Sequence, residues 1–95
     1  MAEIELNADT RLAISAPVMS RLLSEETVLL DLESGMYFGL DGVGQRIWEL
    51  IADGKNLGEI AAVIASEFDV NEEKALSDLI DFAKDLNGRG LLEAG

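Results

Sequence analysis

Carboxylates are the side chains of this sequence most able to do chemistry, because the chain has 19 Asp and Glu residues but no His and no Cys. Three of them, Asp78, Asp81 and Asp85, recur at helical spacing. Lys74 and Lys84 lie among them, and this mixture of charges is typical of a solvated helix face. The pattern therefore indicates no pair of catalytic acids.

Three short motifs resemble sites for an ion or a prosthetic group, and each departs from the pattern that its chemistry requires. Segment 67–73, EFDVNEE, alternates polar ligands as a calcium loop does, but it lacks the glycine of the sixth loop position and interposes Phe68 and Val70. Segment 41–44, DGVG, opens a helix without the lysine of a phosphate-binding loop. Segment 77–79, SDL, inverts the DSL order of a phosphopantetheine carrier and lies within a helix. We predict no catalytic residue, no metal and no cofactor.

Composition narrows the classes of protein further. The absence of Cys and His excludes a disulfide scaffold, a thiolate nucleophile, a Cys/His zinc site and a Ser-His-Asp triad. A net charge of −12 opposes binding to phosphate backbones and to anionic membranes. No apolar run approaches the roughly 18 residues of a membrane-spanning helix, and residues 1–15 lack the basic and apolar regions of a signal peptide. We expect a cytoplasmic protein with no nucleic-acid or membrane partner.

The length of 95 residues fits one domain, with residues 1–9 as a loose arm. Short strands are predicted at Arg11–Ser15 and, as a strand or a turn, at Val18–Leu23. Thr27–Leu32 alternates apolar and polar side chains, and Met36–Leu40 is the returning strand of a hairpin. Residues 33–35 form its three-residue loop, with Gly35 in the left-handed position.

The two strands of this hairpin each have two distinct faces. Val28, Leu30 and Leu32 point to one side, and Leu29 and Asp31 to the other. In the returning strand, Met36, Phe38 and Leu40 share a face opposite to Tyr37 and Gly39. Aromatic residues such as Tyr37 and Trp48 are more often core residues than platforms for a ligand.

Three helices follow the hairpin. The first covers Val43–Asp53 between a cap at Asp41 and Gly54, the second runs from the capping box at Asn56 to about Phe68, and the third lies between Asn71 and Gly88. The second helix buries Leu57, Ile60, Ala61 and Ile64. The apolar tail Gly90–Leu92 can fold back onto the core.

The third helix has more apolar residues than one buried stripe needs. Leu76, Leu79, Ile80, Ala83 and Leu86 already form one buried face, and Phe82, Ala75 and Asp78 widen it toward a flank. Either the helix is central and buried on two sides, or this flank lines a groove beside the strand at Met36–Leu40. An apolar groove with an open strand edge and an acidic rim suits an extended peptide that adds to the sheet.

The succession of these segments resembles a known family. The stretch VLLDLESGMYFGLDGVGQRIWELIADG, the later DLIDFAKDL and the closing GRGLL are similar to the PqqD-like family, that of coenzyme PQQ synthesis protein D. This family includes the B1 proteins of lasso-peptide clusters and supplies recognition elements for ribosomally synthesised, post-translationally modified peptides (RiPPs). The resemblance covers about residues 11–93, with Asp41 where the family often has Asn.

The resemblance implies an α+β, winged helix-turn-helix-like fold with a three-stranded antiparallel sheet packed on three helices. It implies a non-catalytic protein that binds the leader segment of a precursor peptide and presents the core segment to a modifying enzyme. That partner is a radical-SAM enzyme, or a leader peptidase with a cyclase. The leader would add to the third strand and rest against the third helix, and the residues implied by position are Met36, Tyr37, Phe38, Gly39, Leu40, Ala75, Asp78, Leu79, Phe82 and Leu86.

A different class of function shares this fold, namely a winged-helix DNA-binding regulator. It requires a basic recognition helix. The bases of this chain, such as Arg46, Lys74 and Arg89, are scattered among a larger number of acids. The sequence therefore favours a peptide as the partner.

Overall fold

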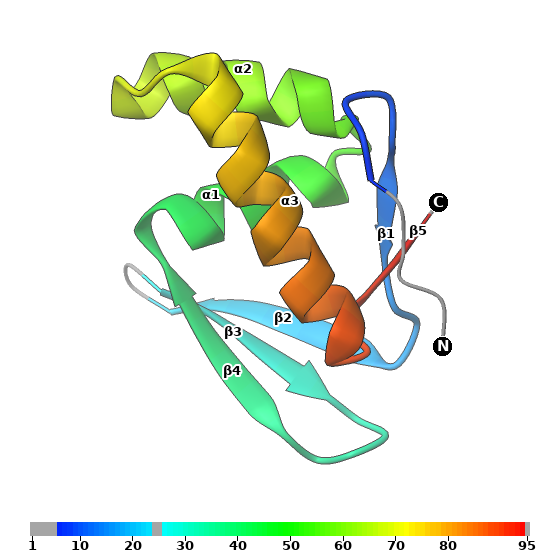
Figure 1. Cartoon of the computed structure of the whole chain (residues 1–95). Coiled ribbons are helices and arrows are strands. Elements are labelled where there is room, and N and C mark those ends of the chain that lie inside the picture. Colours follow the sequence, from blue (N-terminus) through cyan, green and yellow to red (C-terminus); the bar gives the residue numbers. More distant parts are fainter. Residues whose placement is uncertain (1–5, 24–25, 95) are drawn as a thin grey trace.

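The computed structural model describes residues 6–23 and 26–94. The strands are β1 (Leu12–Ile14), β2 (Val18–Leu23), β3 (Glu26–Asp31), β4 (Tyr37–Asp41) and β5 (Leu92–Ala94). The helices are α1 (Gly42–Ala52), α2 (Leu57–Phe68) and α3 (Glu72–Gly88). The expected α+β architecture of three helices and a three-stranded antiparallel sheet is confirmed (Figure 1).

Two sheets divide the strands between them. β2, β3 and β4 form an antiparallel sheet in that order, whereas β1 pairs with β5 in a separate two-stranded sheet. The three helices lie together on one side of the larger sheet, and α3 runs diagonally above it (Figure 1). In the larger sheet, both outer strands, β2 and β4, therefore have an unpaired edge.

The hairpin differs from the sequence expectation at its turn. β3 ends at Asp31, so Leu32 belongs to the loop, and β4 begins at Tyr37 and continues through Asp41. The carboxylate of Asp31 accepts hydrogen bonds from the backbone N–H of Glu33 (3.0 Å) and the hydroxyl of Ser34 (3.0 Å). This side-chain turn closes the loop one residue earlier than alternation indicates. Gly35 has the predicted left-handed conformation, with φ of 77°.

Burial along β3 shows which face of the larger sheet packs against the helices. Leu29 is fully buried and Thr27 nearly so, whereas Val28 and Leu30 lie half-buried on the outer face. Opposite pairing places Phe38 on the same inner face as Leu29.

The helix ends agree with most of the predicted caps. Asn56 forms a complete capping box with Glu59, and the side chain of Asn71 accepts hydrogen bonds from two backbone N–H groups. Asp41 occupies the cap position of α1, but its side chain makes no capping hydrogen bond. α3 includes Gly88 and stops one residue later than expected, before Gly90 takes a positive φ of 79°.

A single cluster of buried side chains joins the helices to both sheets. Leu57, Ile60, Ala61 and Ile64 are buried in α2 as predicted, and the tail is fixed by Leu91 and Leu92, which are 0% and 1% exposed. Among residues 6–23 and 26–94, the buried hydrophobic residues are Leu12, Val18, Leu29, Ile47, Trp48, Leu50, Ile51, Leu57, Ile60, Ala61, Ile64, Ala75, Leu79, Ala83, Leu86, Leu91 and Leu92.

The expected loose arm at residues 1–9 falls partly outside the described residues. Residues 6–10 make a turn that is tied to the start of α2, where Gly58 N–H donates to Ala8 O (2.8 Å) and Leu57 N–H to Thr10 O (2.9 Å). Leu6 also packs against the core. This part of the arm is therefore attached to the domain.

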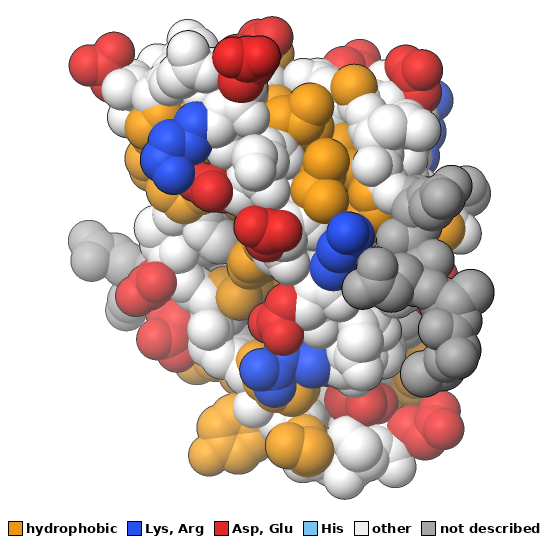
Figure 2. All heavy atoms as spheres, in the orientation of Figure 1, with side chains coloured by type: hydrophobic (Ala, Val, Ile, Leu, Met, Phe, Trp, Pro, Cys, Tyr) orange, Lys and Arg blue, Asp and Glu red, His pale blue; other side chains and the backbone are white. Residues whose placement is uncertain are grey.

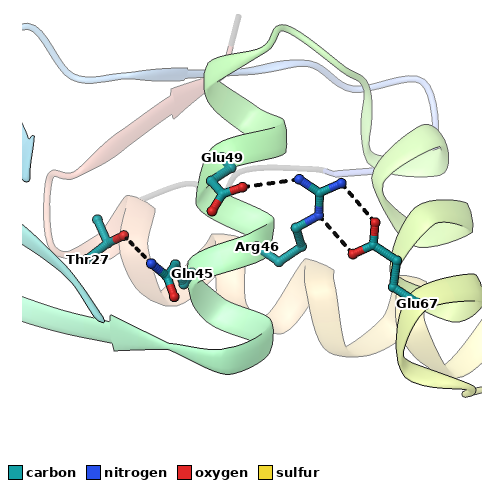
Figure 3. A network of polar contacts seen from close by, with 5 residues as sticks. All are labelled: Thr27, Gln45, Arg46, Glu49 and Glu67. Carbon is teal, nitrogen blue, oxygen red and sulfur yellow. Dashed lines mark hydrogen bonds and ion pairs between the residues drawn. The ribbon is translucent and has the colours of Figure 1, made fainter. Parts of the chain in front are cut away.

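Polar contacts fix α1 against its neighbours (Figure 3). The guanidinium of Arg46 donates two hydrogen bonds of 2.8 Å to the carboxylate of Glu67 in α2 and one of 3.1 Å to Glu49. The amide of Gln45 donates to the hydroxyl of Thr27 in β3 (3.0 Å). Through these contacts the N-terminal turn of α1 is held between the sheet and α2.

Candidate functional site

A cavity of about 440 Å³ opens where the end of β4, the start of α1 and the first half of α3 meet. Its lining residues are Leu40, Asp41, Val43, Gly44, Ile47, Ile64, Phe68, Val70, Ala75, Asp78, Leu79 and Phe82. The lining is apolar except for two carboxylates, Asp41 and Asp78. Such a cavity suits an apolar side chain of a ligand, and its carboxylates can pair with a basic group next to that side chain.

β4 contributes one wall of this site together with an open backbone edge. Phe38 and Leu40 lie on the inner face of the sheet, and Leu40 reaches the cavity. Asp31 N–H donates to Met36 O (2.9 Å), which identifies residues 31 and 36 as a hydrogen-bonded pair. Because such pairs alternate along antiparallel strands, the backbone N–H groups of Tyr37 and Gly39 point away from β3, toward the open edge.

α3 contributes the opposite wall. Ala75 and Leu79 are buried and form the floor of the cavity, whereas Phe82 is half-buried and Asp78 is exposed. The ring of Phe82 also lies over α1, since a Cβ placed on Gly44 would come within 3.6 Å of it. Phe82 therefore stands where α1, β4 and α3 converge.

The apolar strip continues from the cavity toward the C-terminal end of α3. There the guanidinium of Arg89 lies over the ring of Phe38, 5.3 Å from its centroid. Arg89 is also paired with Asp85 at 3.3 Å. In the space-filling view, acidic and basic groups alternate with hydrophobic side chains along this face (Figure 2).

Electrostatics around the site come from separate exposed groups. Asp78 pairs with Lys74 at 3.2 Å, and both side chains are more than half exposed. Between α1 and α2, the guanidinium of Arg46 holds the pKa of the Glu67 carboxyl below its ordinary value of 4.5, chiefly through hydrogen bonding. The pKa of Arg46 is raised by the same bonds, so this pair remains charged across the physiological range.

The structure brings five of the ten predicted site residues into one cavity lining, namely Leu40, Ala75, Asp78, Leu79 and Phe82. Phe38 lies on the same inner face, and Leu86 is buried in the core.

The remaining predicted residues lie at the strand edge or beyond it. Met36 precedes β4 and is 57% exposed. Tyr37 is 74% exposed on the outer face, so its expected place in the core is wrong. It is exposed because no helix covers that face of the sheet. Gly39 shares the outer face with it.

Seven lining residues lie outside the set of site residues predicted from the sequence: Asp41, Val43, Gly44, Ile47, Ile64, Phe68 and Val70. Among them, Phe68 and Val70 are large apolar residues that are 38% and 40% exposed. The sequence contained a sign of this exposure. Two large apolar residues, Phe68 and Val70, flank the C-terminal end of the second helix, where one hydrophobic contact is enough to close the helix.

No metal centre is indicated in the described part of the chain, where no group of three or more acidic side chains is close enough to hold an ion. The calcium-like segment 67–73 is divided between the end of α2, a left-handed Asp69 and the cap of α3. Among the described residues, no helix is long and apolar enough to cross a membrane.

The fold and the site together define a small winged helix-turn-helix-like α+β protein with an open strand edge beside an apolar groove. The chain belongs to the family of coenzyme PQQ synthesis protein D (PqqD), whose family model matches residues 26–92. The family resemblance read from the sequence is thereby confirmed. No match was found among curated proteins.

Two solved structures share the fold. One is TbiB1 in complex with the TbiA(beta) leader peptide, which is 45% identical, with a TM-score of 0.81 over 84% of this chain and 93% of that one. The other is a lasso peptide synthetase B1 complexed with the leader peptide, which is 23% identical, with a TM-score of 0.82 over 87% of this chain and 98% of that one. At this lower identity, the second likeness supports the fold alone.

Proposed function

We propose that this chain binds the leader segment of a ribosomally made precursor peptide and presents the core segment to a modifying enzyme. Membership of the PqqD family and 45% identity to a protein solved with a leader peptide support this function. The observation that carries it is the coincidence of an open β4 edge with an apolar cavity on one side of it.

In this proposal the leader adds to β4 as an antiparallel strand. The backbone N–H groups of Tyr37 and Gly39 donate to leader carbonyls, and this attraction does not depend on the leader sequence. Side chains on the inner face of the leader strand contact Phe38 and Leu40 and continue onto Phe82. One apolar leader residue enters the cavity over Ala75 and Leu79.

Selectivity then comes from the chemistry of the cavity. An apolar anchor is favoured by burial, which is worth about 1.5–3 kcal/mol for one large aliphatic or aromatic side chain. Asp78 stands at the cavity with its carboxylate largely exposed, where a basic or polar leader group can meet it. A free leader is disordered, so these contacts must offset its ordering, and micromolar to nanomolar affinity, roughly −8 to −12 kcal/mol, is expected.

The chain itself supplies binding and no chemistry in this account. A sequence with no His and no Cys has none of the usual nucleophile–base pairs. The partner enzyme, a radical-SAM enzyme or a leader peptidase with its cyclase, carries out the reaction. DNA recognition gains no support, because α3 has five acids and two bases between residues 72 and 88.

Binding tests the proposal directly. Fluorescein-labelled leader peptides are titrated with the full chain and followed by anisotropy. One is the TbiA(beta) leader, and the other comes from any precursor peptide that a gene neighbouring that of this chain encodes. Saturable binding of at least one leader is expected, with no binding of a labelled DNA duplex at low salt. Tight duplex binding together with no leader binding would overturn the proposal.

A further inference from the structure

The outer face of the larger sheet has an unusual composition. An antiparallel sheet that is covered on one side normally turns polar side chains to water on the other. Here Met19, Leu30 and Tyr37 lie directly opposite one another across β2, β3 and β4. Leu23 and Val28 share this face, and so does the exposed Arg21, which lies directly opposite Val28.

Several of these apolar side chains are about half exposed to solvent or more. Met19 is 59% exposed, Tyr37 74% and Leu23 49%, while Val28 and Leu30 are half-buried between them. All three helices lie on the other side of the sheet (Figure 1). Exposed apolar side chains gathered on one face of a small domain, here with Arg21 between Met19 and Leu23, are typical of a surface that another molecule covers.

Charge is distributed unevenly on this face. Glu26 and Asp41 lie directly opposite each other at one end, and the Glu26 carboxylate extends across Gly39, within 3.0 Å of the position that a Cβ would occupy there. Like charges at directly opposite positions destabilise a sheet. No ion pair involving Glu26 or Asp41 occurs among the described residues. A partner with Lys or Arg at this end would relieve that repulsion.

We propose that the outer face formed by Met19, Leu23, Val28, Leu30 and Tyr37 docks the modifying enzyme, through an apolar enzyme surface bordered by basic side chains near Glu26 and Asp41. The proposal rests on the proposed function for the identity of the partner. A second copy of the chain fits poorly, because each copy has a net charge of −12 and would bring its own acidic end to the contact.

The β2 part of this surface lies apart from the leader groove, whereas Tyr37 and Asp41 of β4 adjoin that groove. Met19 and Leu23 belong to β2, the edge strand on the far side of β3 from β4. Enzyme docking through β2 therefore leaves the β4 edge and the cavity free. Substitutions in β2 should therefore weaken enzyme docking without changing leader binding.

β2 supplies a matched pair of variants. Met19 and Leu22 are both apolar and exposed, at 59% and 65%, but Leu22 pairs with Thr27 and so points to the other face. Met19→Glu adds a charge to the outer face, and Leu22→Glu adds the same charge to the inner one. Leu23→Glu repeats the outer-face test at a second exposed position.

The experiment measures two affinities for each variant of the full chain. The first is for labelled leader, and the second is for the purified enzyme that processes the same precursor, by biolayer interferometry with and without leader. We expect Met19→Glu and Leu23→Glu to weaken enzyme binding by about ten-fold or more, and Leu22→Glu by less than about two-fold. Leader affinity is expected to stay unchanged in all three. Higher salt should weaken the wild-type enzyme complex.

Three outcomes would overturn the docking proposal. One is unchanged enzyme binding in both outer-face variants that retain the wild-type amide spectrum. Another is an equal loss in Leu22→Glu. The third is a wild-type dimer, by analytical ultracentrifugation, that Met19→Glu converts to a monomer, which would identify a second copy as the occupant. Loss of leader binding in the wild-type chain would instead contradict the proposed function, because leader affinity is measured without the enzyme.

Discussion

The two sheets of this protein use apolar residues in opposite ways. In the small sheet, Leu12 of β1 and Leu92 of β5 are 5% and 1% exposed and close the core beneath α1 and α3. In the larger sheet, Met19 and Tyr37 are more than half exposed, and β4 ends beside an open cavity. The comparison separates apolar residues that stabilise the fold from those that remain available to partners.

The largest expected effect is on the closed side. Leu92→Ala removes a buried side chain from β5 and leaves a cavity, which should cost about 2–5 kcal/mol of the free energy of unfolding. Denaturant unfolding followed by circular dichroism measures this loss. The leader affinity of the fraction that stays folded should be unchanged. A loss of leader affinity in that folded fraction would contradict the assignment of the small sheet to stability alone.

A large effect on binding is expected on the open side. Phe82→Ala removes the half-buried ring at the convergence of α1, β4 and α3, and should weaken leader binding by about 1–3 kcal/mol, which is roughly 5- to 150-fold. Ile80→Ala is the control, because Ile80 is also half-buried in α3 but is absent from the cavity lining. Calorimetric titration with leader measures both variants, and equal losses would remove Phe82 from the groove.

A smaller effect is expected from the cavity charge. Asp78→Asn keeps the shape of the side chain but removes its negative charge, and should weaken binding of a leader with a basic group by about two- to five-fold, less at high salt. Asp81→Asn is the matched control on the exposed side of α3. Should both variants bind like the wild type across a salt series, Asp78 would have no part in selecting the leader.

The smallest effect concerns the Arg46–Glu67 pair that links α1 to α2. The folded-state pKa of Glu67 is lowered, so its ionised form stabilises the fold above the ordinary carboxyl pKa of 4.5, and this contribution is lost as the pH falls through the lower folded value. Glu67→Gln should therefore be slightly less stable than the wild type at pH 7, and the difference should be smaller at about pH 3, below the ordinary carboxyl pKa of 4.5. Thermal melts at both pH values test this, and an equal difference at both would contradict the ion pair as the cause.

Much of the fold was predictable because its signals are local. The capping box at Asn56 and the cap at Asn71 mark two helix starts, and Gly54 with φ of 84° ends the first helix. The buried face of α2 follows from helical periodicity alone. The strand predicted at Thr27–Leu32 is observed one residue earlier, as β3. The carboxylate of Asp31 forms a side-chain turn that ends the strand, and the alternation of apolar residues through Leu32 gives no indication of this turn.

The parts that were missed depend on which elements meet in space. Phe68 and Val70 are apolar residues at the junction of α2 and α3, and they line the cavity beside the start of α1. Tyr37 is exposed because the helices cover only one face of the sheet. Pairing of β1 with β5 joins residues some eighty positions apart, which periodicity within a single strand cannot indicate.

Hydrogen exchange at the two free edges of the larger sheet tests the central claim most directly. Alternation of hydrogen-bonded pairs leaves the amides of Tyr37 and Gly39 unpaired on β4, and those of Ser20 and Leu22 unpaired on β2. Saturating leader should slow exchange at Tyr37 and Gly39, which gain partners, and leave Ser20 and Leu22 unchanged. Protection at the β2 edge, or tight leader binding with no protection at either edge, would contradict strand addition to β4.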